Sequence, residues 1–344
     1  TEAVGQVVER VSTPWTREDA RTLAALSAAG LVFVAALLLA TTPPDALTAL
    51  DPKGVTRYNF IAGAIGIVAA LLVTATSVVM TRKHPQTSGI ALAHSVPFLT
   101  AAAALRLSQS HWDTAGWAWT GLGLLIGSLA VLTLTKRYRI SIAAPLVVGT
   151  VLAATGLLVR LGQLSQAGVS AILFALMIVL LQVAPWIALA HIPVRILDAD
   201  TTEQIPAKGI TDQVSTSFVF VVALRSGGAI AALFLTVCLM TAPETRSVSL
   251  PLTLIMLGAV SLVLQTRSIR ARVEVLLGAL TGLVVILVAT VLSAYADPRT
   301  MPWLTLAAIA TALVLVVTNV VGPRARPHLT RIADTISVLS LFVL

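Results

Sequence analysis

Charged residues are scarce in this sequence. Only 11% of its 344 residues are Asp, Glu, Lys or Arg, whereas a soluble domain has about 25%. Hydrophobic residues make up 57% of the chain, and its mean hydropathy is +0.94. So few charges cannot cover the surface of a water-soluble fold of this length. The composition therefore excludes a soluble protein and indicates that the lipid bilayer is the main solvent.

Cysteine and the common catalytic motifs are also nearly absent. The single Cys238 excludes an internal disulfide and a multi-thiolate metal site. His191 and His328 have no second ligand at metal-binding spacing. The sequence contains no phosphate-binding loop, zinc-protease helix motif or serine-hydrolase elbow. We therefore predict that the protein is not an enzyme and holds no catalytic residue, cofactor or metal.

Long apolar windows recur along the whole chain, and most are long enough for a helix that crosses the bilayer. They cover residues 23–40, 60–80, 88–105, 116–134, 142–159, 168–190, 227–242, 250–264, 273–294 and 301–321, and an eleventh begins near Ile336. The windows are apolar all round, whereas the strands of an outer-membrane barrel alternate in polarity. We predict an all-α, polytopic transmembrane bundle of about eleven spans.

The basic residues alternate between the two sides of this bundle. One set of alternate connections holds sixteen Lys and Arg residues and the other set holds six. Because short loops rich in Lys and Arg stay in the cytoplasm, this asymmetry predicts a multi-pass membrane protein with a cytoplasmic N-terminus. The formal charge of +8 follows from the same bias, so we expect no nucleic-acid partner.

The chain has a short polar segment before its first span. Val4, Val7, Val8 and Val11 repeat there at helical spacing. We predict that residues 1–21 form a cytoplasmic amphipathic linker and that residues 22–344 form the transmembrane bundle. The chain starts with Thr and stops inside an apolar run, so we expect a longer protein whose last helix is truncated here.

Ionisable residues are rare inside the predicted spans. All 15 acidic residues fall outside the spans or at their ends, and Glu274 and Asp334 come closest to a span interior. Both stand beside cytoplasmic arginines, so we expect solvated pairing. We expect Arg106, Arg160 and Arg225 to extend their charged groups toward the headgroups from nearby span ends. The sequence thus contains no visible proton relay, which disfavours a transporter.

His94 and Pro97 keep an alternative open. His94 is the best candidate for a functional polar group at depth, and Pro97 frees a backbone carbonyl near it. We favour a neutral histidine bonded to that carbonyl. The alternative function is a secondary transporter or permease with its substrate site here, which predicts inverted repeats that the sequence does not clearly show. A membrane-embedded transferase would need an acid–base pair, which we do not recognise.

Two pairs of glycines are candidates for close helix packing. Gly123 and Gly127 are spaced four residues apart, as are Gly278 and Gly282. Small residues at this spacing form a ridge that lets two helix backbones approach, either within one bundle or between subunits.

Two cytoplasmic segments are candidates for contact with partners. A polar connection over about residues 191–217 carries Arg195 and Lys208, and a basic turn carries Arg267, Arg270 and Arg272. We predict that these five side chains contact partner subunits or anionic lipid headgroups. Their ordinary role in setting membrane topology is the simpler alternative for each of them.

Three stretches resemble the EccD family, the polytopic membrane subunit of the mycobacterial type VII (ESX) secretion systems. The predicted sixth span ends in APWIALAHIP over residues 184–193. LVLQTRSIR over residues 262–270 leads into a glycine-containing helix. Residues 327–334 precede the final apolar run. The resemblance covers most of the chain.

The resemblance implies an eleven-helix protein that pairs with a second copy of itself around a lipid-filled cavity. It implies assembly with EccB, EccE and the ATPase EccC in the inner membrane. Membrane lipids would be further partners, and folded helical clients of the WXG100, PE and PPE type would be served indirectly. A ubiquitin-like cytoplasmic domain precedes the first helix in this family and is absent from this chain. The implied function is a non-catalytic scaffold of the secretion machine.

Overall fold

The computed structural model describes residues 17–41, 52–83, 88–110, 112–134, 142–190, 207–245, 247–265 and 272–300, with Pro302 and Thr335. Within these ranges the regular structure is helical and comprises nine α-helices and one 3-10 turn. Eight of the α-helices are long and apolar enough to cross a membrane, and a ninth apolar helix is shorter. The predicted all-α transmembrane fold is confirmed. The predicted window 301–321 and the one beginning near Ile336 lie outside the described ranges.

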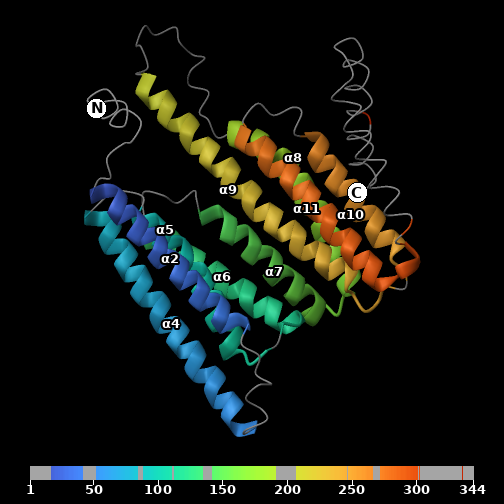
Figure 1. Ribbon diagram of the computed structural model, residues 1–344, viewed down its shortest axis with the longest axis horizontal. Helices are drawn as coiled ribbons and strands as arrows, with labels where there is room; N and C mark the ends of the chain where they lie inside the picture. The colour runs from blue at the N-terminus through green and yellow to red at the C-terminus, as the bar shows by residue number, and fades with distance from the viewer. Residues whose placement is uncertain are drawn as a thin grey trace, which may run out of the picture. The chain divides into compact units, whose positions relative to one another are not determined.

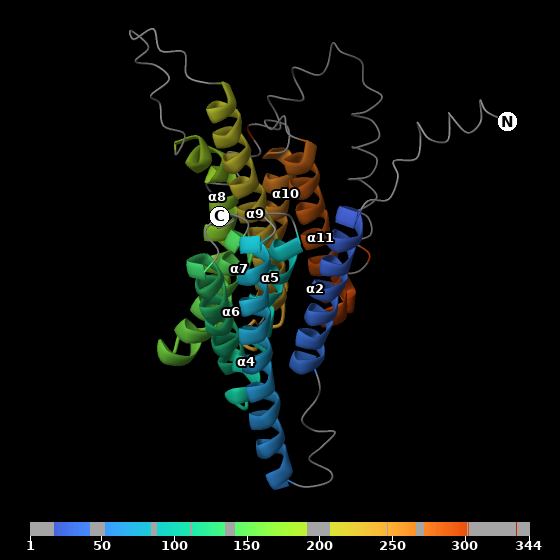
Figure 2. The same cartoon turned by 90° about the vertical axis from the view of Figure 1, so that its left-hand side faces the viewer.

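The chain divides into two compact units, residues 1–142 and 143–344. The first unit contains α2 (Arg17–Thr41), α4 (Pro52–Lys83), α5 (Ser88–Leu107) and α6 (Thr114–Leu134). Helix α5 packs against each of the other three (Figure 1). Its buried side chains include three consecutive alanines at 101–103, which allow close approach of its neighbours. Helix α4 has 32 residues and extends beyond α2 at one end (Figure 2).

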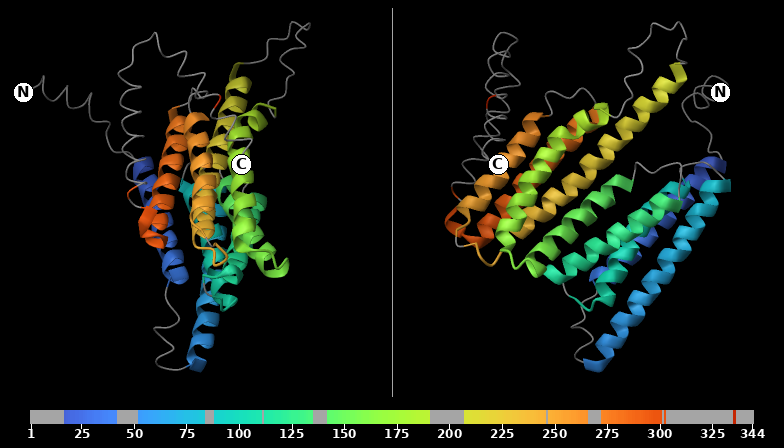
Figure 3. Two further views of the ribbon diagram at one scale, coloured as in Figure 1. Left: turned by 90° about the vertical axis from the view of Figure 1, so that its right-hand side faces the viewer. Right: turned by 180° about the vertical axis from the view of Figure 1, so that it is seen from behind.

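The second unit contains five helices, with four of them arranged around α9 (Figure 3). They are α7 (Ala143–Leu161), α8 (Gln166–Ala190), α9 (Ala207–Met240), α10 (Ser249–Gln265) and α11 (Arg272–Ala296), followed by the 3-10 turn η3 (Pro298–Thr300). Helix α9 packs against α7, α8 and α11, and α10 packs against α11 and α8. Only four residues separate α7 from α8, so these two neighbours run antiparallel.

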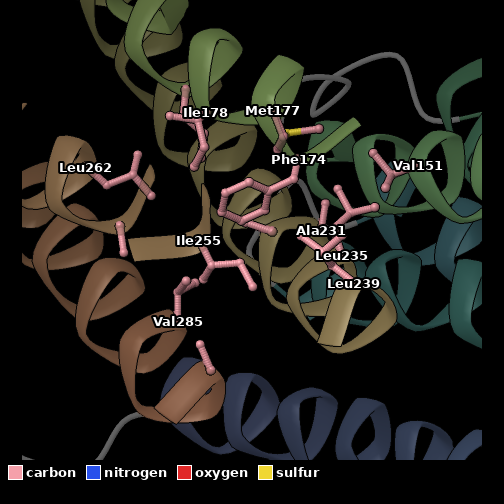
Figure 4. Packing of buried hydrophobic residues seen from close by; sticks show 14 of the residues in the cluster. Val151, Phe174, Met177, Ile178, Ala231, Leu235, Leu239, Ile255, Leu262 and Val285 are labelled. Carbon is pink, nitrogen blue, oxygen red and sulfur yellow. The ribbon is translucent and has the colours of Figure 1, made fainter. Parts of the chain in front are cut away.

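The core of the second unit is apolar and close-packed (Figure 4). Phe174 of α8, Leu235 of α9, Ile255 of α10 and Val285 of α11 are fully buried in one cluster. A Cβ atom at Gly258 of α10 would lie 2.7 Å from Cε1 of Phe174, so a larger residue there would force the buried ring to shift. Because lipid tails are as apolar as these side chains, this packing stabilises the unit mainly through dispersion contacts.

Most predicted spans coincide with helices to within a few residues, but the seventh does not. It was expected over residues 227–242, whereas the apolar part of α9 is Ser217–Met240 and the helix itself begins at Ala207. The polar connection expected over residues 191–217 is therefore shorter, since residues 207–216 belong to α9. A helix that continues past its apolar segment with polar residues leaves no signal in a hydropathy window, which explains why residues 207–216 were missed. Residues 217–226 were missed because Arg225 interrupts the apolar stretch.

The expected linker over residues 1–21 is described only in part. Residues 1–16 lie outside the described ranges, and residues 17–21 belong to α2, which continues into the first candidate span, Leu23–Thr41.

Candidate functional site

A buried ion pair joins α9 to α11 in the described part of the second unit. Nη1 of Arg225 lies 3.6 Å from Oε2 of Glu274, and the two side chains are only 4% and 10% exposed. The expectations of a headgroup-directed Arg225 and a solvated Glu274 are therefore wrong. Glu274 lies in the first turn of α11, where its negative charge also interacts favourably with the helix dipole.

A chain of amide hydrogen bonds lies on the neighbouring helices. Nε2 of Gln182 on α8 donates to the Ser261 hydroxyl of α10, and Nε2 of Gln265 donates to the Gln182 carbonyl oxygen at 3.0 Å. Ser261 is fully buried. These bonds join α8 to α10, and Gln265 and Arg225 line the same small cavity. Polar groups from four helices are thus gathered in this part of the unit.

The first unit has its own buried arginine, at the end of α5. Arg106 is 6% exposed, so the prediction that it reaches the headgroups is also wrong. Its Nε donates to the Leu39 carbonyl of α2, and its Nη1 lies 3.3 Å from Oδ1 of Asn59 on α4. The Trp112 indole N–H donates to the adjacent Ala40 carbonyl at 3.3 Å. Arg106 and Trp112 therefore cap carbonyls at the C-terminal end of α2 that have no partner within their own helix.

His94 is half-buried in α5 and bonded to its own helix. Nδ1 of His94 lies 2.7 Å from the carbonyl oxygen of Ile90. The expected acceptor was the carbonyl that Pro97 frees, which in an α-helix belongs to Ala93, four residues before the proline. The structure thus shows the expected backbone bond with a different acceptor, one turn earlier. This bond satisfies one ring nitrogen locally.

A groove of about 550 Å³ runs between α4, α5 and α6 of the first unit. Its lining is almost entirely aliphatic, and its few polar side chains are Thr74, Thr100, Ser108 and Trp119. Thr100 donates to backbone carbonyls, including that of Gly123 at 2.8 Å. Nothing titratable lines this groove, so its surroundings offer no acid–base chemistry.

Three of the four packing glycines lie at close helix contacts. A Cβ atom at Gly123 would lie 2.6 Å from the Thr100 carbonyl oxygen, and one at Gly127 would lie 2.7 Å from Cα of Pro97. A Cβ atom at Gly282 would lie 2.9 Å from the carbonyl oxygen of Ala259 on α10. Gly278 lies one turn earlier on α11 and lines the cavity beside Arg225.

The five predicted contact residues are only partly described. Arg195, Arg267 and Arg270 lie outside the described ranges. Lys208 belongs to the first turn of α9, and Arg272 is the first residue of α11 with an exposed side chain. Two of the five are thus placed at the starts of helices. The described residues contain no group of three or more His, Cys, Asp or Glu that could hold a metal ion.

Arg106, Asn59, Arg225, Glu274 and the amides of Gln182 and Gln265 were not among the predicted site residues. One signal in the sequence pointed to the ion pair. Arg225 follows an apolar stretch over residues 218–224 and, with Ser226, precedes the apolar stretch from Gly227, so it interrupts a single long span. An arginine within a membrane span is expected to pair with an acidic residue, and Glu274 is one of the two acids closest to a span interior.

The fold and the contacts of the buried charges define the class of protein. The described chain is a polytopic helical membrane protein whose buried charges pair with one another or with backbone carbonyls. The sequence family of EccD-like transmembrane domains matches residues 20–344. The chain therefore belongs to this family and is a multi-pass protein of the inner membrane. No curated protein sequence matches it.

Two solved structures share the fold. A chain of the MycP5-free ESX-5 inner membrane complex in State II is 17% identical with a TM-score of 0.63, over 93% of this chain and 75% of that chain. A chain of protomer 1 of the ESX-3 core complex is 16% identical with a TM-score of 0.66, over 100% of this chain and 79% of that chain.

Proposed function

We propose that this protein is a non-catalytic membrane scaffold of a type VII (ESX) protein secretion machine. The observation that carries the proposal is the match of the EccD-like transmembrane domain to residues 20–344. The similar solved chains belong to an ESX-5 inner membrane complex and an ESX-3 core complex.

The chemistry of the described residues supports a scaffold. The charged side chains buried in the bundle are Arg106, Arg225 and Glu274. Arg106 binds a helix end, and the other two pair with each other. Such contacts hold helices together, whereas an ion-coupled transporter needs a charged group that changes partners during its cycle.

In this scaffold the chain pairs with a second copy of itself and docks the secretion ATPase and the other core subunits, EccB and EccE. The cytoplasmic ends carry the docking groups, with Arg272 exposed at the start of α11 and Arg195, Lys208, Arg267 and Arg270 as further contacts. These groups are suited to acidic partner surfaces and to anionic lipid headgroups.

The test is secretion in cells that lack this protein. We expect that its removal abolishes export of the small helical clients of the system, and that the wild-type chain restores export. Uptake of small solutes by the purified protein in liposomes should stay at the level of empty liposomes. Normal export in its absence, together with uptake that depends on His94, would contradict the scaffold and support the permease.

A further inference from the structure

The second unit contains a small cavity beside the buried ion pair. Its volume is about 10 Å³, and its polar lining comes from Arg225 of α9, Gln265 of α10 and Thr281 of α11. Leu181, Leu262, Leu277 and Gly278 complete the lining. Three helices thus contribute a polar residue to one cavity in an otherwise apolar bundle.

Arg225 has more donors than its ion pair uses. Nη1 is directed at Glu274, while Nε and Nη2 are buried and have no hydrogen-bond partner among the described residues. In a guanidinium group the Nε–H and one Nη2–H point the same way, and together they form an edge that binds an oxygen acceptor. A buried charged donor without an acceptor is strongly unfavourable, so an oxygen is required at this edge.

The volume of the cavity indicates which chemical group supplies this oxygen. A single water molecule needs a cavity of at least about 10–15 Å³ by this kind of measure. A volume of about 10 Å³ therefore admits one water and excludes a phosphate or carboxylate group. We propose that one ordered water molecule binds in this cavity, accepting hydrogen bonds from Nε–H and Nη2–H of Arg225.

The same water has two hydrogens to donate, and the lining offers two acceptors. The Thr281 hydroxyl gives its own hydrogen to the Leu277 carbonyl at 2.6 Å, so its oxygen accepts. Gln265 uses its amide nitrogen Nε2 to donate to the Gln182 carbonyl. Its amide oxygen Oε1 is the second acceptor for the water. With these partners the water makes four hydrogen bonds, within the range typical of buried waters.

The water joins two separate polar groups into one network. The Arg225–Glu274 pair links α9 to α11, and the Gln182–Ser261–Gln265 bonds link α8 to α10. Through the water the four helices are connected by a continuous series of polar contacts, made of the ion pair and hydrogen bonds. The network fixes the register of these helices where their apolar surfaces alone would let them slide.

Radiolytic hydroxyl labelling of the full chain in its native membrane assembly tests the proposal, because a bound water generates radicals beside side chains that bulk solvent cannot reach. Leu262 and Leu235 are both buried, at 4% and 0% exposure, but only Leu262 lines the cavity. We expect labelling of Leu262 several-fold above that of Leu235. Equal labelling of the two leucines would overturn the proposal.

A matched pair of variants controls for transient opening of the whole bundle to solvent. Thr281 and Thr290 both lie on α11 and both donate to the carbonyl four residues earlier. Thr281→Val removes one acceptor of the water with little change in shape, whereas Thr290→Val lies away from the cavity. We expect Thr281→Val to lower Leu262 labelling several-fold and Thr290→Val to leave it unchanged. An equal effect of both variants would contradict a bound water.

Discussion

Arg225 and Glu274 form a buried ion pair, with 3.6 Å between Nη1 and Oε2, although the two residues come from different transmembrane helices. Each charge makes the burial of the other tolerable, because an isolated charge in a bilayer is strongly unfavourable. The pair therefore fixes where α11 can sit along α9. In a bundle held mainly by dispersion contacts, it is a strong determinant of register.

The first prediction concerns removal of one partner of this pair. Glu274→Leu leaves the Arg225 charge buried without its counter-charge, and Arg225→Met does the same to Glu274. We expect each single change to lower the free energy of unfolding by about 3–5 kcal/mol. Thermal unfolding of the protein in lipid nanodiscs measures the loss.

The double variant shows whether the two residues act as a pair. Replacing both residues with apolar side chains removes both desolvation penalties, so Arg225→Met with Glu274→Leu should regain much of the stability lost by either change alone. If the losses of the two single variants simply add, the ion pair does not hold α9 and α11 together.

The second prediction concerns the buried arginine of the first unit. Arg106 donates to the Leu39 carbonyl and to Asn59, and hydrogen bonds from a charged group contribute about 1.5–3 kcal/mol each. We expect Arg106→Gln to lower the unfolding temperature clearly. Arg160 is the matched control, because it also lies in the last turn of its helix but is exposed. Equal effects of Arg106→Gln and Arg160→Gln would refute the capping role.

The third prediction concerns the contact of α7 with α9. A Cβ atom at Gly227 would lie 2.5 Å from the carbonyl oxygen of Ala144 and 2.7 Å from its Cα. Both are backbone atoms, so Gly227→Ala must push α7 away, and overpacking of this kind costs about 1–3 kcal/mol. Gly30 of α2 has nothing within 4 Å of its Cβ position, so Gly30→Ala should leave stability unchanged or slightly raised. Thermal unfolding of the two variants side by side checks this contrast.

The apolar part of this fold was predictable because hydropathy windows report burial in lipid directly. The windows 116–134 and 250–264 lie within three residues of α6 and α10 at each end. The start of α9 was not predictable in this way, since most of its first ten residues are polar or charged. Arg106, Arg225 and Glu274 were misjudged because each stands near the end of an apolar window, where a solvated charge is the usual case. Whether such a charge is buried depends on partners far along the chain, such as Asn59 for Arg106, which local sequence cannot reveal.

The fourth prediction concerns the basic turn before α11. Reversal of charge at Arg267, Arg270 and Arg272 together should reduce assembly with the other core subunits and reduce secretion, because like charges would then meet an acidic partner or anionic headgroups. Membrane insertion of the variant, checked by fractionation, separates this effect from a change of topology. Normal assembly and secretion by a stably inserted variant would exclude the turn as a docking surface.

The most direct test of the scaffold is purification of the full-length protein from gently solubilised membranes, with mass spectrometry of the subunits that accompany it. We predict a large complex that contains two copies of this chain, an ATPase of the FtsK type and the other core subunits. A lone monomer or homodimer that is stable under the same conditions would contradict a scaffold of the secretion machine.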